Sequence, residues 1–520
     1  MKKNPSILWV TAFVLGWLFD FLFWKQSFGI NFALYTLLCL IGGFFVLRLN
    51  KQQPALSSLW LLPLVLFFGV VTFVRAEPLS LFLGVICTLF LMSILAMTFH
   101  GGRWFRYSLA DYVSSFFKLA GSMVARPFSF NAEVKRERSK NGEVTKIINP
   151  WPIVRGILIA LPIVAIFASL LASADVIFSH QLDLFVKFFR IENLPQYIFR
   201  LVYILGGAYL LAGVFLHTAL QSKDEKLIGV DKPLVDPFLG FTETTVVLGS
   251  VTLLFTGFVF IQFRYIFGGQ ANINIEGFTY SEYARRGFGE LLAVAFFSLL
   301  MILGMGAIAE RENEKKRRIY SGLNVAIVVL VMIMLVSAYE RLILYEAAYG
   351  FSRLRTYTHV MLVWIGLLLG AVVILEIFRY ERAFASAALI TSLGFAASLS
   401  ILNVDGFIVR QNVNRAIQGQ GLDVPYLVSL SDDSVPELVR EFRSTELPGL
   451  TRDGVGAVLF CHLHSDSTRS NKDWRSFTLS GWWANARINE VKAQLERYRI
   501  IDDQWPLQIL TPDSVSYNCY

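Results

Sequence analysis

The chain has 520 residues, of which 55% are hydrophobic and 17% are charged, and its formal net charge is +8. Soluble domains contain nearer 25% charged residues, so this composition excludes an ordinary soluble protein. The apolar residues fall in blocks of about 18 to 23, long enough to cross a hydrocarbon core of about 30 Å. The sequence therefore predicts an all-α polytopic membrane protein.

We predict eleven transmembrane helices within residues 1–402, followed by a small, mostly helical C-terminal domain over residues 403–520. The C-terminal domain contains 12 Lys and Arg against 15 Asp and Glu, so the excess positive charge belongs to the bundle. The predicted spans are approximately 7–24, 30–47, 57–74, 78–99, 153–174, 199–219, 241–263, 289–309, 321–340, 357–378 and 383–402.

Basic residues gather in alternate loops, the pattern that marks the cytoplasmic side of a membrane protein. We therefore place the N-terminus in the cytoplasm, and the odd number of spans places the C-terminal domain outside it. Because the charge lies in short loops between spans, we expect membrane lipids and not nucleic acid as partners. The basic loops begin at Lys2, Arg48, the 100–152 segment, Lys223, Lys315 and Arg379.

Two loops carry apolar residues at helical spacing. In the cytoplasmic 100–152 loop this predicts an amphipathic helix that lies on the inner leaflet or packs on the bundle, with the stretch from Lys135 to Gly142 as a solvated loop. A similar outer stripe has the same two interpretations. The stripes are Phe105, Leu109, Val113, Phe116, Ala120 and Val124, and then Phe178, Leu182, Phe185 and Phe189.

The outer ends of the seventh to tenth spans contain arginine but no lysine. An all-arginine set favours fixed bidentate partners, because guanidinium matches the geometry of carboxylate or phosphate. The favoured interpretation is internal pairing with the glutamates of the same segments, and the alternative is a site for an anionic lipid head group or anionic solute. The residues are Arg264, Arg285, Arg286, Arg341, Arg353 and Arg355, with Glu276, Glu282, Glu290, Glu340 and Glu346.

Tyr345 and Tyr349 share a helical face with Arg341, either as part of an interfacial aromatic belt or as ligand contacts. Ionisable residues inside spans suggest function, although near span ends they also snorkel or cap a helix. Asp20 and Glu243 have both interpretations. Glu290 and Glu340 are the candidates for a general base if the protein is an enzyme.

In the C-terminal domain, Cys461 and Cys519 would lie in an oxidising compartment, so we predict a disulfide unless Cys461 is simply buried core. The run from Cys461 to Asp466 contains two histidines at i, i+2, which diverge on the helix expected there, so we predict no metal site. Ser434 predicts a capping box, and Ser480 predicts the start of a long helix ending near Arg499.

Five sequence runs resemble a bacterial family of multi-pass membrane proteins known only as a domain of unknown function, of the 4173 type. The resemblance covers about residues 150–440 and implies a multi-pass protein of the bacterial plasma (inner) membrane. The family carries no assigned activity, so the resemblance implies no catalytic residue and no cofactor. The runs are Gln262–Gly269, Thr279–Phe288, Arg341–Gly350, Asn412–Arg415 and Tyr426–Ser431.

Three classes of function fit this sequence. We prefer a non-enzymatic protein of envelope structure or signalling. The alternatives are a transporter of an anionic solute or lipid, which should show inverted repeats and broken helices, and a membrane enzyme acting on a lipid-linked substrate.

Overall fold

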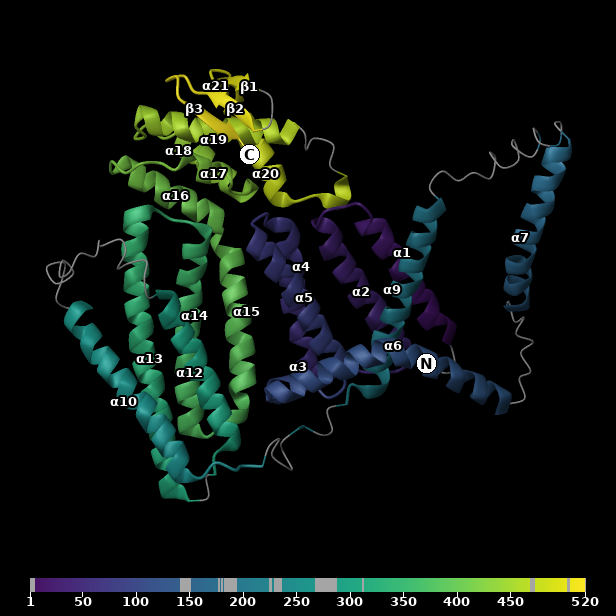
Figure 1. Cartoon of the computed structure of the whole chain (residues 1–520), viewed down its shortest axis with the longest axis horizontal. Helices are drawn as coiled ribbons and strands as arrows, with labels where there is room; N and C mark the ends of the chain where they lie inside the picture. The colour runs from purple at the N-terminus through teal and green to yellow at the C-terminus, as the bar shows by residue number, and fades with distance from the viewer. Residues whose placement is uncertain are drawn as a thin grey trace.

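A computed structural model describes residues 5–140, 151–175, 178, 181, 194–223, 227–228, 236–266, 288–310, 313–467, 473–502 and 506–519. Within these residues, ten helices are long and apolar enough to cross a membrane, and the only sheet has three strands (Figure 1). The predicted all-α polytopic membrane fold is confirmed.

In the N-terminal half of the bundle, the first four spans pack with one later helix, α9 (Leu194–Gln221). Its buried core is continuous with α15 (Phe384–Leu402), because Leu389 and Ala396 of α15 share a cluster with Leu61 and Leu91. The elements from the N-terminus to α9 are α1 (Pro5–Phe23), α2 (Ile30–Leu49), α3 (Leu56–Leu59), α4 (Leu61–Val74), α5 (Pro78–Thr98), the 3-10 turn η1 (Trp104–Arg106), α6 (Leu109–Lys140), α7 (Trp151–Ala174) and α9 (Leu194–Gln221).

The other half of the bundle has its own core around α13, in which Ile327, Val331 and Leu342 are fully buried. Figure 1 shows α13, α14 and α15 side by side, with their upper ends beneath the C-terminal elements. This half consists of α10 (Phe241–Ile266), α12 (Phe288–Ile308), α13 (Glu314–Tyr349), α14 (Arg353–Phe378), the turn η3 (Glu381–Ala383) and α15 (Phe384–Leu402).

The C-terminal domain is mostly helical and ends in an antiparallel sheet of order β1-β2-β3. Its largest buried cluster joins Val409, Leu438 and Val458 with Leu399 at the end of α15, so the domain and the bundle share a core. Its elements are α16 (Val404–Ile417), α17 (Val424–Val428), η4 (Asp432–Ser434), α18 (Val435–Phe442), α19 (Gly449–Ser467), η5 (Trp474–Ser476), α20 (Leu479–Asn489), α21 (Lys492–Leu495), β1 (Arg499–Asp502), β2 (Leu507–Leu510) and β3 (Ser516–Cys519).

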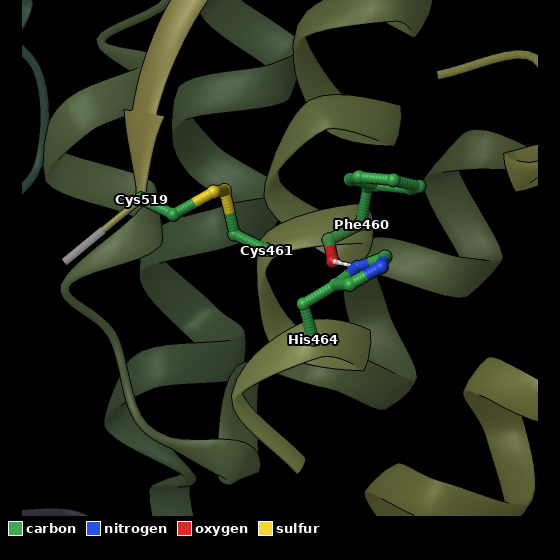
Figure 2. Close-up of a disulfide and its surroundings, with 4 residues drawn as sticks. All are labelled: Phe460, Cys461, His464 and Cys519. Carbon is green, nitrogen blue, oxygen red and sulfur yellow. Dashed lines mark hydrogen bonds between the residues drawn. A yellow bond between two sulfur atoms is a disulfide. The ribbon is translucent and has the colours of Figure 1, made fainter. Parts of the chain in front are cut away.

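A disulfide fastens the last strand to the helical part of this domain. Cys461 on α19 is bonded to Cys519 at the end of β3, with their Cα atoms 5.4 Å apart (Figure 2). One turn along α19, His464 Nδ1 lies 3.0 Å from the carbonyl oxygen of Phe460, and the imidazole contacts the phenyl ring of Phe460 at a tilt, with the ring centroids 4.2 Å apart. Both cysteines are buried, so the bridge lies within the core of the domain.

The amphipathic helix predicted in the 100–152 loop is α6, and it extends further than expected. Residues from Lys135 to Lys140, predicted as loop, are helical. Gly213 of α9 faces α6 so closely that a Cβ atom there would lie 2.4 Å from the carbonyl oxygen of Met123. On the far side, Phe117 and Phe128 are 70% and 78% exposed, so this apolar face of α6 is not covered by the described part of the protein.

In the C-terminal domain the helix start predicted at Ser480 is wrong, whereas the start predicted at Ser434 is right in position but lacks the predicted capping bond. Thr478, and not Ser480, accepts from the first turn of α20, which ends at Asn489, and the chain enters β1 by Arg499. Ser434 precedes α18 without capping it, because its hydroxyl donates to the carbonyl of Ser431. The outer apolar stripe from Leu182 to Phe189 lies outside the described residues.

Candidate functional site

Where the bundle meets the C-terminal domain, an arginine–aspartate pair with a buried carboxylate and a half-buried guanidinium joins α14 to α16. Arg353, the first residue of α14, donates from Nε to Asp405 Oδ1 at 2.7 Å and from Nη2 to Oδ2 at 2.6 Å. Asp405 is 0% exposed and lies in the first turn of α16, where a carboxylate also complements the helix dipole. A parallel pair of charge-assisted bonds fixes both distance and orientation.

A backbone-like pairing holds the turn between α13 and α14 to α16. Asn412 Oδ1 accepts from the N–H of Phe351 at 2.8 Å, and its amide donates to the Phe351 carbonyl at 2.9 Å. The approach requires Gly350, whose φ is +79° and whose added Cβ would lie 2.5 Å from Arg415 Nη1. Arg415 also donates to the carbonyl of Ala347 at the end of α13.

The segment around α17 completes the same junction. The N–H of Arg353 donates to the hydroxyl of Tyr426 at 2.7 Å, and the N–H of Ser431 donates to Asp405 Oδ2 at 2.7 Å. Burial raises the pKa of Tyr426, so its hydroxyl stays protonated. Three runs that are far apart in the sequence, Arg341–Gly350, Asn412–Arg415 and Tyr426–Ser431, therefore meet in one place.

A second set of contacts joins the turn between α4 and α5 to the domain. Asp433 Oδ2 accepts from the N–H groups of Ala76 and Glu77 at 2.8 and 2.9 Å, and Arg75 lies 3.9 Å from Oδ1. The Glu77 carboxylate caps α5 and accepts from the Tyr357 hydroxyl of α14. Glu77 and Asp433 are 1% and 5% exposed, so these charges depend on their partners.

Two of the six predicted arginines, Arg353 and Arg355, lie in the junction. Arg353 pairs with Asp405, a residue outside the predicted set of acids. Arg355 donates to the carbonyl of Gly350 and stacks on Tyr345, with its Cζ atom 4.2 Å from the ring centroid. Both arginines thus use partners inside the protein, although neither pairs with one of the glutamates that we had expected.

The rest of the predicted cluster is only partly described. The rings of Tyr345 and Tyr349 meet edge to face with their centroids 5.0 Å apart, and Glu290 and Glu340 are exposed. Glu346 is buried and lies 2.8 Å from His359 Nε2. The Arg264 side chain, Arg285, Arg286, Glu276 and Glu282 lie outside what the structure describes, so an anion site built from the whole cluster stays a prediction.

The two ionisable residues predicted near span ends have structural partners. Asp20 accepts from Arg200 Nε at 3.0 and 3.1 Å, which links the end of α1 to the start of α9. Glu243 Oε2 accepts from the N–H of Gly240 at 2.7 Å and so caps α10. Both therefore have the structural role that we had set beside the functional one.

The histidines of the C-terminal domain lie on a helix, as predicted, and point apart. The His464 ring contacts the ring of Phe460, whereas His462 Nδ1 lies 3.9 Å from Asp432 Oδ1. Among the residues that the structure describes, no three or more His, Cys, Asp or Glu side chains are grouped to hold a metal ion.

The acids of the junction escaped sequence analysis for different reasons. Glu77 directly before Pro78 is a recognisable helix start and could have been found. Asp405 and Asp433 carry no local signal, because their partners lie 52 and 356 residues away in the chain. The junction holds the bundle and the C-terminal domain in a fixed relative position, because its described carboxylates accept hydrogen bonds from other parts of the same chain.

These features define a multi-pass membrane bundle with a domain docked on one end. The family model described as "Domain of unknown function (DUF4153)" matches residues 62–441, and the chain belongs to this family. The 4173 type that we had inferred is therefore the wrong number, and the match begins well before residue 150. No curated protein and no solved structure matches the chain.

Proposed function

We propose that the protein is a non-enzymatic component of the bacterial plasma membrane whose bundle holds the C-terminal domain rigidly at the outer surface, as a scaffold for envelope structure or signalling. The observation that carries this proposal is the pairing of Arg353 with fully buried Asp405. A flexible tether would not need to bury a charged pair, since taking charges out of water costs several kcal/mol per ion.

The proposal also accounts for the second set of contacts. Asp433 holds the α4–α5 turn while Asp405 holds α14, so the domain is fixed to both halves of the bundle. Two separate attachments restrict rotation as well as separation. The internal use of Arg353 and Arg355 further favours this function over an outer anion site built on those two residues.

Hydrogen exchange on the full-length protein tests whether the domain is docked as a unit. In Asp405→Ala, the amides of Ala76 and Glu77 should exchange about 100-fold faster or more, although neither contacts Asp405. Removing one partner of a buried pair costs about 3–5 kcal/mol, and local opening follows that cost. The conservative Arg353→Lys variant should give an intermediate effect.

The matched control is Glu314→Gln, which breaks an exposed pair with Arg379 at the opposite ends of α13 and α14. Exchange at Ala76 and Glu77 should not change in this variant. Unchanged exchange in Asp405→Ala, or fast exchange at these amides in the parent protein, would show that the domain is not rigidly held and would overturn the proposal.

A further inference from the structure

At the end of the bundle away from the C-terminal domain, α6, α9 and the segment that follows α9 enclose a cavity of about 780 Å³. Its lining includes Lys118 and Arg126 of α6 and Lys223 just beyond α9. Lys118 and Lys223 are exposed, so the cavity opens to water. This position is remote from the junction described above, and the argument does not depend on the function proposed there.

The charges of the cavity are unbalanced. Asp111 is the only carboxylate among its described lining residues, against three cations. Both oxygens of Asp111 are already used: Oδ2 accepts from the N–H and hydroxyl of Ser108 at 2.9 and 2.8 Å, and Oδ1 accepts from the N–H of Ile228 at 2.7 Å. Within the described residues, no carboxylate lies within 4.0 Å of Lys118, Arg126 or Lys223.

A fixed polar wall completes the cavity. The buried Ser122 hydroxyl donates to Gln221 Oε1 at 2.9 Å and lies 2.9 Å from Nδ1 of His217, which is 4% exposed. These contacts tie α6 to α9 and fix the groups between the cations. The Ser114 hydroxyl donates to the carbonyl of Asp111 at 3.2 Å, and Ser115 on the same face of α6 adds a hydroxyl that can donate to an anion.

The cavity also lies at the depth where phosphate groups occur. The polar positions of α6 face the cavity, whereas Val113, Phe117, Val124 and Phe128 on the opposite side are 56–78% exposed. A helix with these two faces lies along the boundary between hydrocarbon and water. Basic residues at this boundary attract anionic groups, with about 1 kcal/mol for each Lys or Arg.

We propose that this cavity binds the phosphate group of an anionic ligand, with Lys118, Arg126 and Lys223 as its cationic contacts. The phosphate belongs either to the head group of an anionic lipid or to a soluble phosphorylated compound. Guanidinium binds phosphate through paired hydrogen bonds and ammonium binds it as a point charge, so the set combines orientation with attraction.

Thermal unfolding of the full-length protein in nanodiscs separates the two sources. One arm adds pyrophosphate to protein in phosphatidylcholine nanodiscs, and the other replaces part of that lipid by phosphatidylglycerol. A ligand that binds only the folded state raises the melting temperature. A shift in the first arm identifies a soluble phosphate, a shift in the second a lipid head group, and a shift in both the shared chemistry.

The variant Lys118→Gln/Arg126→Gln should lose most of the shift. Its control, Lys135→Gln/Arg136→Gln, removes the same charge from exposed positions further along α6 and should keep it. Should the first variant fail to fold, Lys223→Gln changes one exposed loop residue. It should raise the half-maximal concentration of the effective probe about fivefold, which corresponds to about 1 kcal/mol.

Three results would overturn the proposal. They are no shift with either probe in the parent protein, a full shift in the variants of Lys118, Arg126 or Lys223, and an equal loss of the shift in the cavity variant and its control. The last result would show that any positive charge on α6 suffices and that the cavity is not involved.

Discussion

Gly350 shows how one residue without a side chain determines the geometry of the junction. Its φ of +79° and ψ of 177° lie in a region that is almost exclusive to glycine, and Arg415 and Asn412 fill the space where a Cβ would be. The turn that delivers Phe351 to Asn412 thus requires both the backbone freedom and the small volume of glycine.

We predict that Gly350→Ala lowers the free energy of unfolding by about 3 kcal/mol, as backbone strain adds to overpacking. Gly419→Ala is the matched control, because Gly419 also has a positive φ of +91° but nothing lies within 4 Å of its added Cβ. It should cost only about 1 kcal/mol. Chemical denaturation of both variants measures the difference, and equal losses would mean that the contacts with Arg415 and Asn412 do not matter.

Asp433 makes the stability of the protein depend on pH. Desolvation by burial raises the pKa of this carboxyl in the folded state, against the opposing effects of the Ala76 amide and Arg75. Between its ordinary pKa of about 4 and the raised value, the folded state binds more protons than the unfolded state. The contribution of Asp433 to stability is therefore fully present at low pH and falls as the pH rises through this window.

We predict that Asp433→Asn removes this pH dependence and keeps an oxygen that can accept from Ala76 and Glu77. The melting temperature of the parent protein should fall relative to that of the variant as the pH rises from 4 towards 7. Melting curves of both proteins at unit steps of pH measure the effect, and a constant difference between them would contradict it.

The residues of the junction were predictable only in part. Arginine without lysine at the outer ends of the spans indicated that bidentate partners were needed, and Arg353 has such a partner in Asp405. The identity of the partner was not predictable, because aspartates at helix starts look alike in sequence whether they face water or a buried guanidinium. Only tertiary packing distinguishes the two cases.

Helices were predicted well where hydrophobic blocks decide them and poorly where caps decide them. The block near 321–340 is indeed a span, but α13 runs from Glu314 to Tyr349, because polar turns at both ends continue the helix beyond the apolar part. Ser434 and Ser480 carried local capping signals that the structure does not use. Their neighbours Ser431 and Thr478 act instead as caps, at η4 and α20.

The bridge between α19 and β3 should stabilise the C-terminal domain. It closes a loop with a sequence separation of 58, for which the chain-entropy model gives about 4 kcal/mol. We predict that Cys519→Ser, or reduction of the parent protein, lowers the melting temperature of the domain. Cys39→Ser, in the membrane bundle, is the control and should not change the response to reductant.

Labelling of thiols in denatured protein gives a direct measurement. In a variant that lacks Cys39 and Cys87, no thiol should react before reduction and two should react afterwards. Two reactive thiols without reductant would contradict the bridge and would also weaken the placement of the domain in an oxidising compartment.

At the scale of the whole molecule, the packing of α9 bears on the number of spans. The start of α9 pairs with the end of α1 through Arg200 and Asp20, and its last turns pack on α6, whose far end contacts the first half of α1. The chain must therefore pass from one end of the bundle to the other between Lys140 and Leu194. The described part of the chain thus has ten helices that are long and apolar enough to span a membrane where we predicted eleven, and an eleventh crossing in this passage, which includes α7, stays a prediction.

We predict that the N-terminus and the C-terminal domain lie on opposite sides of the membrane, with the domain outside the cytoplasm. A reporter enzyme that is active only outside the cytoplasm should be active when fused after Val424 and silent when fused after Lys316. Each fusion keeps the chain up to the named residue, so the positive charges of the loops before that residue still determine the orientation of the spans. The reverse pattern of activity would invert the whole topology.

The long separation between the partners of the junction has a consequence in time. Ala76 and Glu77 are made 356 or more residues before Asp433, the acceptor of their N–H groups. At about 5–20 residues per second, synthesis takes roughly 20 to 70 s to produce that partner. Until then, these two amides lack the carboxylate that accepts from them in the finished protein. This part of the junction can therefore form only after Asp433 has been made, and the bridge between Cys461 and Cys519 must form later still.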